Sequence, residues 1–133
     1  MDLLNSKVLL IGGAGFIGSH TAEALIKEKV KEIIIFDDFS RGTLKNIQSI
    51  IDNPNVKIFE DADILNLHKL RLAMENVDYV FHFAALWLLE CQNYPSKAFD
   101  VNIKGTFNVI ETCREMNIKK LIFSSSASVY GDM

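Results

Sequence analysis

The sequence predicts an α/β fold: a doubly wound parallel sheet of about five strands in the order 3-2-1-4-5, with helices on both faces. Three features support this prediction. Short apolar runs alternate with longer amphipathic segments, a glycine-rich turn follows the first apolar run, and polar residues follow the later runs. The 133 residues, 49% of them hydrophobic, suffice to bury one core, so we expect a single domain.

Each element is predicted from its local pattern. We expect strands at residues 7–11, 32–36, 56–60, 78–83 and 120–123, which are short apolar runs typical of a parallel sheet. We expect helices at residues 16–29, 43–51, 66–75 and 95–116, guided by apolar periodicity and by turn residues at their ends. The expected buried side of the first helix consists of Ile17, Ala22, Ala24, Leu25 and Ile26.

A run of glycines joins the first expected strand to the first expected helix. Gly12, Gly13, Gly15 and Gly18 satisfy both G-x-G-x-x-G and G-x-x-G-x-x-G. In such a turn, backbone N–H groups at a helix N-terminus can bind a pyrophosphate, and the glycines let the backbone approach it. The run therefore predicts a dinucleotide site of the Rossmann type. The alternative is a glycine turn that binds no ligand.

Two acids follow the second expected strand. Asp37 and Asp38 lie near the spacing of about 20 residues at which a carboxylate meets the adenosine ribose. A carboxylate there accepts hydrogen bonds from the ribose hydroxyls and repels a 2′-phosphate, which favours NAD over NADP. Arg41 could oppose this preference by attracting the phosphate. The alternative for both acids is a solvated loop.

Several other polar or small residues also follow expected strands. In a doubly wound sheet, ligands bind beyond the carboxyl ends of the strands, where the strand order reverses. Asp63, the pair Ala84 and Ala85, and the serines at 124–126 join the glycine turn and Asp37 in such positions. We therefore expect all five features at one edge of the sheet.

Composition excludes several classes of function. A formal net charge of −3 without a cluster of Lys and Arg argues against a nucleic-acid partner. The longest apolar run, residues 79–89, is too short to span a membrane and contains His82. Cys91 and Cys113 are isolated and lack metal-ligand spacing, so we expect no metal and a reducing, cytoplasmic environment.

The motifs together resemble the extended short-chain dehydrogenases/reductases, specifically nucleotide-sugar epimerases and dehydratases of the UDP-glucose 4-epimerase type. The matching segments are GGAGFIGSH at 12–20, DDFSRG at 37–42, DI at 63–64, HFAA at 82–85, VNIKGT at 101–106 and SSSASVYGD at 124–132. They extend over essentially the whole chain in the family's order. The resemblance implies a Rossmann-type fold with NAD as cofactor.

The resemblance also implies roles for single residues. The residues assigned to the pyrophosphate are Gly12, Gly15, Phe16, Ile17 and Gly18. Asp37, with Asp38 and Ser40, would bind the adenosine ribose, and Asp63 and Ile64 the adenine. Phe83, Ala84 and Ala85 would line the path to the nicotinamide, and Ser124 is also assigned to cofactor binding. Asn102 would approach the cofactor from the long helix, and its alternative role is to steady that helix.

Ser126 matches the family's catalytic serine, which would hydrogen-bond the reacting sugar hydroxyl. From the residues alone, three serines after a strand are more often a polar loop or a helix cap than a catalytic site, and the resemblance reverses that preference. The family's general base lies in a Tyr-x-x-x-Lys motif, so Tyr130 is expected to be structural. Residues 1–133 are accordingly expected to be an incomplete NAD-binding domain, inactive alone, without the Tyr-x-x-x-Lys helix and the C-terminal substrate domain.

Ala127 and Ser128 stand where the related dehydratases carry Asp-Glu. The resemblance therefore favours an epimerase that oxidises the sugar at C4 and returns the hydride to the opposite face. The alternatives are a dehydratase or reductase of the same family, or a non-catalytic NAD-binding module. Trp87, at a position where epimerases often have lysine, would either pack or face substrate. The implied partners are a UDP-hexose and, through the helix around 102–116, a second copy in a homodimer.

Overall fold

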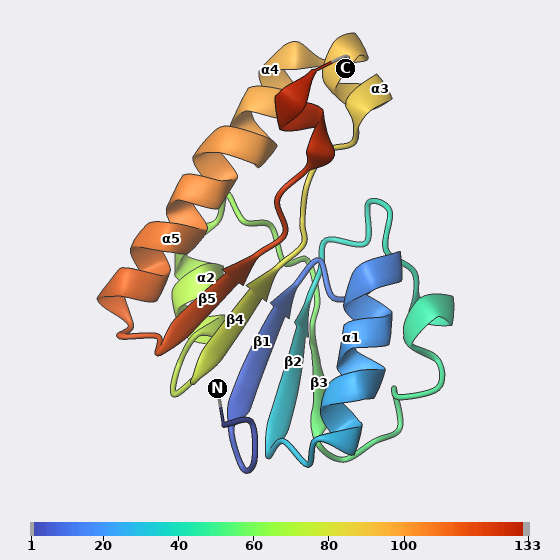
Figure 1. Ribbon diagram of the computed structural model, residues 1–133, viewed down its shortest axis with the longest axis vertical. Coiled ribbons are helices and arrows are strands. Elements are labelled where there is room, and N and C mark those ends of the chain that lie inside the picture. Colours follow the sequence, from blue (N-terminus) through green and yellow to red (C-terminus); the bar gives the residue numbers. More distant parts are fainter. Residues whose placement is uncertain (1, 132–133) are drawn as a thin grey trace.

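The computed structural model describes residues 2–131 and confirms the predicted α/β architecture (Figure 1). Its strands are all parallel and form one sheet in the predicted order β3-β2-β1-β4-β5. They are β1 (Lys7–Ile11), β2 (Glu32–Phe36), β3 (Val56–Phe59), β4 (Tyr79–His82) and β5 (Lys120–Phe123). The order reverses at β1, which places the expected ligand site at the carboxyl ends of β1, β2 and β4.

Helices cover both faces of the sheet, with α1 (Phe16–Lys27) on one side and α2 (Leu67–Ala73) and α5 (Thr106–Glu115) on the other (Figure 1). Alternate residues of β1 enter two separate cores. Val8 and Leu10 pack with the core on the α1 side, whereas Leu9 and Ile11 pack with the core that includes α2 and α5. The continuous apolar runs of the sequence are thus explained by burial on both faces.

The first two expected helices differ from the structure. α1 ends at Lys27 because Lys29 adopts a φ of 56°, which is not helical. Ile17 and Ala24 were expected on its buried side, and both are exposed; Ile17 lies at the cleft described below. The helix predicted at 43–51 is wrong: only the short 3-10 turn η1 (Leu44–Ile47) forms there.

Tertiary hydrogen bonds explain why that segment is not a full helix. Thr43 N–H and Asn46 Nδ2 both donate to the carbonyl of Ala14, at 3.2 and 2.8 Å. The segment is therefore fastened to the glycine turn, and it buries Ile47 and Ile50 through successive turns.

The long helix expected at 95–116 forms as consecutive helical segments of different type. They are α4 (Pro95–Ala98), the π-helical segment η2 (Phe99–Gly105) and α5. A short helix that was not predicted, α3 (Leu88–Asn93), precedes them, and the 3-10 turn η3 (Ala127–Tyr130) follows β5. The π-helical segment contains Asn102, whose side chain bonds a neighbouring segment, as described below.

Within residues 2–131, no helix is long and apolar enough to cross a membrane. The same residues contain no group of three or more His, Cys, Asp or Glu that could hold a metal ion. Cys91 and Cys113 are free thiols, and Cys113 is buried. Burial raises the pKa of the Cys113 thiol to about 11.

Candidate dinucleotide-binding site

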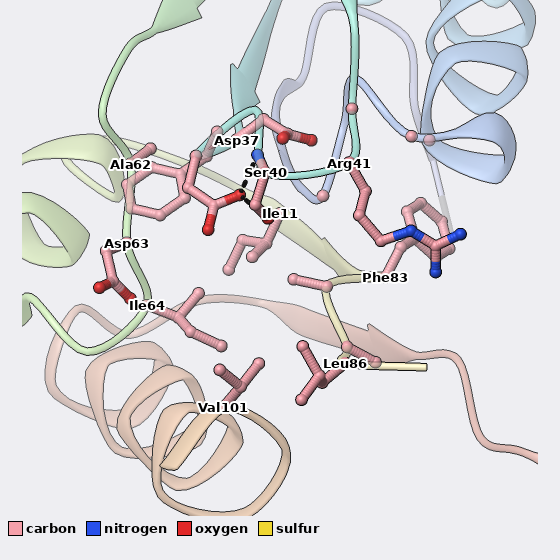
Figure 2. Close-up of a pocket in the computed structure, with 18 of the residues that line it drawn as sticks. Ile11, Asp37, Ser40, Arg41, Ala62, Asp63, Ile64, Phe83, Leu86 and Val101 are labelled. Atoms are coloured by element: carbon pink, nitrogen blue, oxygen red, sulfur yellow. Dashed lines mark hydrogen bonds between the residues drawn. The ribbon is translucent and has the colours of Figure 1, made fainter. Parts of the chain in front are cut away.

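A cleft of about 480 Å³ opens at the carboxyl edge of the sheet (Figure 2). This volume is within the range of roughly 300–1,000 Å³ that is usual for small-molecule sites. The predicted cofactor residues, apart from Asn102 and Ser124, line the cleft. They are Gly12, Gly15, Phe16, Ile17, Gly18, Asp37, Asp38, Ser40, Asp63, Ile64, Phe83, Ala84 and Ala85. Residues from four separate segments of the sequence thus meet at one place.

The glycine turn leads directly from β1 into α1, as expected. Gly12 has a φ of 77°, and a Cβ on this residue would lie 2.7 Å from the backbone nitrogen of Ala84. A Cβ on Gly18 would lie 2.7 Å from the Cα of Gly13. Glycine is therefore required at both positions, because the turn passes close to the backbone after β4 and to the start of α1.

The N-terminus of α1 lacks the side chains that usually balance the positive end of a helix. Its N-cap residue, Gly15, provides no side-chain cap, and the first turn contains no acidic residue. The first N–H groups of a helix have no partner within the helix, and they carry the positive end of its dipole. Phe16 and Ile17 line the cleft, so the N–H groups of this first turn are placed to bind an anion such as a diphosphate.

Asp37 lies at the end of β2 and is only 6% exposed. Its carboxylate accepts hydrogen bonds from the N–H groups of Ala14 and Phe39, both at 2.9 Å. Burial raises the pKa of Asp37, while these two hydrogen bonds act in the opposite direction. Asp37 therefore fixes the glycine turn, and the carboxylate retains further acceptor capacity toward the cleft.

The other acids at this end of the cleft are exposed and locally bonded. Asp38 accepts hydrogen bonds from the backbone N–H and the hydroxyl of Ser40, at 2.9 and 2.6 Å. Asp63 accepts from the N–H of Leu65 at 2.8 Å. Next to Asp63, the buried Ile64 is held by Asn108, whose side-chain amide donates to the Ile64 carbonyl at 3.1 Å. One end of the cleft is thus acidic. Its wall at Ile64 is held in place by a hydrogen bond from Asn108 of α5.

Asn102 bonds the backbone of the segment that follows β4. Its Oδ1 accepts from the N–H of Leu86 at 2.7 Å, and its Nδ2 donates to the carbonyl of the same residue at 3.0 Å. Nδ2 also lies 3.4 Å from the sulfur of Cys91. The structure thus gives Asn102 a positioning contact and places it behind the cleft wall; direct contact with a cofactor stays a prediction.

The two predicted serines follow β5 and lie outside the cleft lining. Ser124 N–H donates to the carbonyl of His82 at 3.1 Å, which extends the pairing of β5 with β4. Ser126 is exposed and caps η3 by accepting a hydrogen bond from Ser128 N–H at 3.2 Å. The catalytic role of Ser126 stays a prediction, and the exposure of the residue is compatible with it.

His82, the last residue of β4, is fully buried beneath the site. Its Nε2 lies 3.1 Å from the Thr106 hydroxyl, whereas its Nδ1 has no hydrogen-bond partner among the described residues. Burial lowers the pKa of His82 to about 4, so the ring is neutral at pH 7. A neutral ring with hydrogen on Nε2 can donate to Thr106 and leaves only an acceptor lone pair unsatisfied.

Sequence reasoning missed several residues that line the cleft. Among them are Asn46, Glu90, Lys97 and Val101, and Arg41 was considered only as a modifier of cofactor choice. Asn46 was missed because it lies in the segment at 43–51, which was predicted to be a helix and not part of the site. Glu90 and Lys97 belong to α3 and α4, and nothing in their local sequence indicates that these short helices turn toward the glycine turn.

The fold and the site define a doubly wound α/β protein of the Rossmann type with a ligand cleft at its strand-order reversal. A family model described as the 3-beta hydroxysteroid dehydrogenase/isomerase family matches residues 9–133. The chain is 38% identical over 130 residues to the bifunctional protein GAL10 of Candida maltosa, covering 94% of this chain and 84% of that protein. It is 36% identical over 136 residues to UDP-glucose 4-epimerase of Dictyostelium discoideum, covering 99% of this chain and 39% of that enzyme.

Among solved structures, the chain is similar to UDP-glucose-4-epimerase from Stenotrophomonas maltophila with bound NAD and formylated UDP-arabinopyranose. The TM-score is 0.85 at 32% identity, with 96% of this chain and 39% of that chain covered. The chain belongs to the extended short-chain dehydrogenases/reductases, in the NAD-dependent epimerase/dehydratase group that is similar to UDP-glucose 4-epimerase. It spans about two fifths of the length of the Dictyostelium and Stenotrophomonas enzymes.

Proposed function

We propose that this chain binds NAD in the cleft and forms the cofactor-binding part of a nucleotide-sugar 4-epimerase that acts on a UDP-hexose. The observation that carries the proposal is the meeting, in one cleft, of three features: an uncapped helix N-terminus, a turn that admits no side chain at Gly12, and the buried carboxylate of Asp37. The first two favour a diphosphate, and the third favours ribose hydroxyls. NAD contains both groups.

The proposal assigns each part of NAD to residues at the cleft. The diphosphate would bind at the first turn of α1, the adenosine ribose at Asp37, and the adenine beside Asp63 and Ile64. Asp37, Asp38 and Asp63 make this end of the cleft negative, which opposes the 2′-phosphate of NADP. Phe83 and the alanines after β4 would direct the nicotinamide end toward substrate.

When bound, NAD supplies the hydride transfer that oxidises the sugar at C4 and then reduces it from the opposite face. In this proposal Ser126 holds the reacting sugar hydroxyl by a hydrogen bond, which its exposure after β5 permits. Ala127 and Ser128 provide no carboxylic acid next to it, which supports epimerisation over dehydration. Because the chain contains no Tyr-x-x-x-Lys sequence, proton removal is assigned to other parts of the complete enzyme.

An exposed apolar stripe on the helical segments η2 and α5 supports the proposed homodimer. Phe99, Ile103, Phe107 and Ile110 lie at helical spacing, and each is between 47% and 60% exposed. A continuous apolar stripe of this kind is typical of a protein interface. We propose that a second copy covers this stripe in the complete enzyme, which we place in the cytoplasm because both cysteines are free thiols.

The function is tested with the polypeptide that the complete reading frame encodes, supplied with UDP-glucose or UDP-N-acetylglucosamine and NAD. The proposal expects the corresponding C4 epimer as product. Release of a 4-keto-6-deoxy sugar would instead identify a dehydratase, and NAD binding without turnover of any nucleotide sugar would identify a non-catalytic module. The matched variant is Ser126→Ala, which should lose turnover and retain NAD binding.

A further inference from the structure

Arg41 and Trp87 meet at the rim of the cleft, although they come from different segments. The Cζ atom of Arg41 lies 4.9 Å from the centroid of the Trp87 ring, which is a cation–π contact. Arg41 lines the cleft from the loop after β2, and its side chain extends toward the segment that carries Phe83 (Figure 2). Trp87 lies in the sequence between Leu86 and Glu90, two residues that also line the cleft.

The backbone beside Arg41 is fastened to the glycine turn. Gly42 packs so closely that a Cβ there would lie 2.7 Å from Asp37 Oδ1 and 2.9 Å from the Cβ of Ala14. Thr43 N–H donates to the Ala14 carbonyl at 3.2 Å. The loop therefore holds Arg41 at a fixed place relative to the proposed diphosphate site.

The backbone beside Trp87 is fastened from the other side. Both backbone polar groups of Leu86 bond the side chain of Asn102. The carbonyl of Trp87 accepts a hydrogen bond from Cys91 N–H at 3.0 Å, which begins α3. These hydrogen bonds fix the backbone that carries the Trp87 indole. The side chain itself is 43% exposed.

The charged residues that line the cleft indicate which group of the ligand Arg41 would bind. Asp37, Asp38 and Asp63 line the proposed adenosine end, and the other charged residues of the lining are the cations Arg41 and Lys97 and the acid Glu90. A guanidinium is permanently charged and matches the geometry of phosphate oxygens. An unsupported arginine would lose side-chain freedom on binding a diphosphate, but one already stacked on an indole loses less.

We propose that Arg41 and Trp87 form a clasp across the cleft, in which Trp87 holds the Arg41 guanidinium in place for the diphosphate of the bound dinucleotide. Trp87 is a positioning residue in this account, because it acts through Arg41. The inference rests on the proposed NAD site and adds to it a residue pair that governs how long the dinucleotide stays bound.

The test measures the affinity of NAD, ADP-ribose and adenosine by calorimetry, and NAD release by stopped flow, for the whole chain and its variants. Arg41→Ala should weaken NAD about 10- to 100-fold, the usual effect of losing a charged hydrogen bond. Trp87→Ala should weaken NAD roughly threefold, mainly through faster release. Trp87→Phe should fall between Trp87→Ala and the unmodified chain. Lys45→Ala is the matched control, since it removes an exposed charge from the same region without lining the cleft.

Two comparisons separate positioning from a general structural role. Adenosine lacks the diphosphate, so its affinity should be equal in the unmodified chain and in all the clasp variants. In the double variant, the loss should equal that of Arg41→Ala alone, because Trp87 then has no guanidinium to hold. Melting temperatures establish that each variant is folded.

Each result has a defined meaning. Failure of the unmodified, folded chain to bind NAD would overturn both the proposed function and the clasp. NAD binding that both single variants leave unchanged would overturn the clasp alone. A loss with Arg41→Ala but none with Trp87→Ala, or an equal loss of adenosine affinity, would overturn the positioning role of Trp87.

Discussion

Acidification should destabilise this protein in part through the buried side chain of His82. The ring is fully buried, lies within hydrogen-bond distance of the Thr106 hydroxyl, and has a pKa lowered to about 4 from an ordinary value of 6.5. In the unfolded chain the same ring takes up a proton near pH 6.5. Stability from the neutral ring is therefore fully present above pH 6.5 and is progressively lost as the pH falls from 6.5 to 4.

The size of this effect follows from the difference between the two pKa values. A difference of about 2.5 units corresponds to a loss of roughly 3 kcal/mol of unfolding free energy when acidification is complete. This is a large fraction of the about 5–15 kcal/mol that is usual for a domain. Asp37 contributes with the opposite sign, because its raised pKa favours proton uptake by the folded state.

The assay is urea unfolding followed by circular dichroism at several pH values between 7 and 4. The control variant is His82→Asn, which keeps a side-chain donor but cannot take up a proton in this range. It should be less stable than the unmodified chain at pH 7, because a buried ring is lost. Its stability should nevertheless change by about 3 kcal/mol less between pH 7 and 4.

Subtracting the two pH profiles removes the effect of carboxylates, including Asp78, whose pKa is lowered chiefly by its hydrogen bond from Lys119. Parallel profiles in the two proteins would refute the reasoning. So would a pKa near 6.5 for His82, measured by NMR titration of the folded chain.

Three further changes test the glycine turn, the Asn102 contact and the apolar stripe. Gly12→Ala should cost at least about 1–2 kcal/mol of stability, because the residue has a positive φ and abuts Ala84, and should weaken NAD binding in calorimetry; unchanged stability and affinity would contradict this account. Asn102→Ala leaves Leu86 N–H without its partner and should lower the unfolding free energy by about 1–3 kcal/mol in urea melts; a smaller loss than for the exposed Asn55→Ala would argue against it. Phe107→Glu should reduce self-association of the chain in light scattering, and a monomeric unmodified chain at high concentration would oppose the proposed interface.

The sheet was predictable because its strands are short apolar runs that end at polar residues. β5 has the predicted bounds, and the strand order is the predicted one. Each strand is buried by its neighbours, so local hydrophobicity and the handedness of crossovers contain enough information. The glycine turn was predictable for a related reason, since its backbone requirement at Gly12 permits few other residues.

The remaining differences depend on contacts between distant segments. The segment at 43–51 has helical spacing, but hydrogen bonds from Thr43 and Asn46 to Ala14 fix it in turns instead. Ile17 has the spacing of a core residue and lies at the cleft. The contact of Arg41 with Trp87 joins two loops whose relative placement depends on the completed sheet. Local sequence patterns contain no information about such pairs.

Every role assigned to this chain depends on the binding of NAD in the cleft between the glycine turn, Asp37 and the segment after β4. The most direct measurement is a calorimetric titration of the folded 133-residue chain with NAD and, separately, with NADP. We predict saturable binding of one NAD per chain, weaker binding of NADP, and a higher melting temperature in the presence of NAD. A chain with a cooperative melting transition that neither binds NAD at millimolar concentration nor gains thermal stability from it would contradict the account.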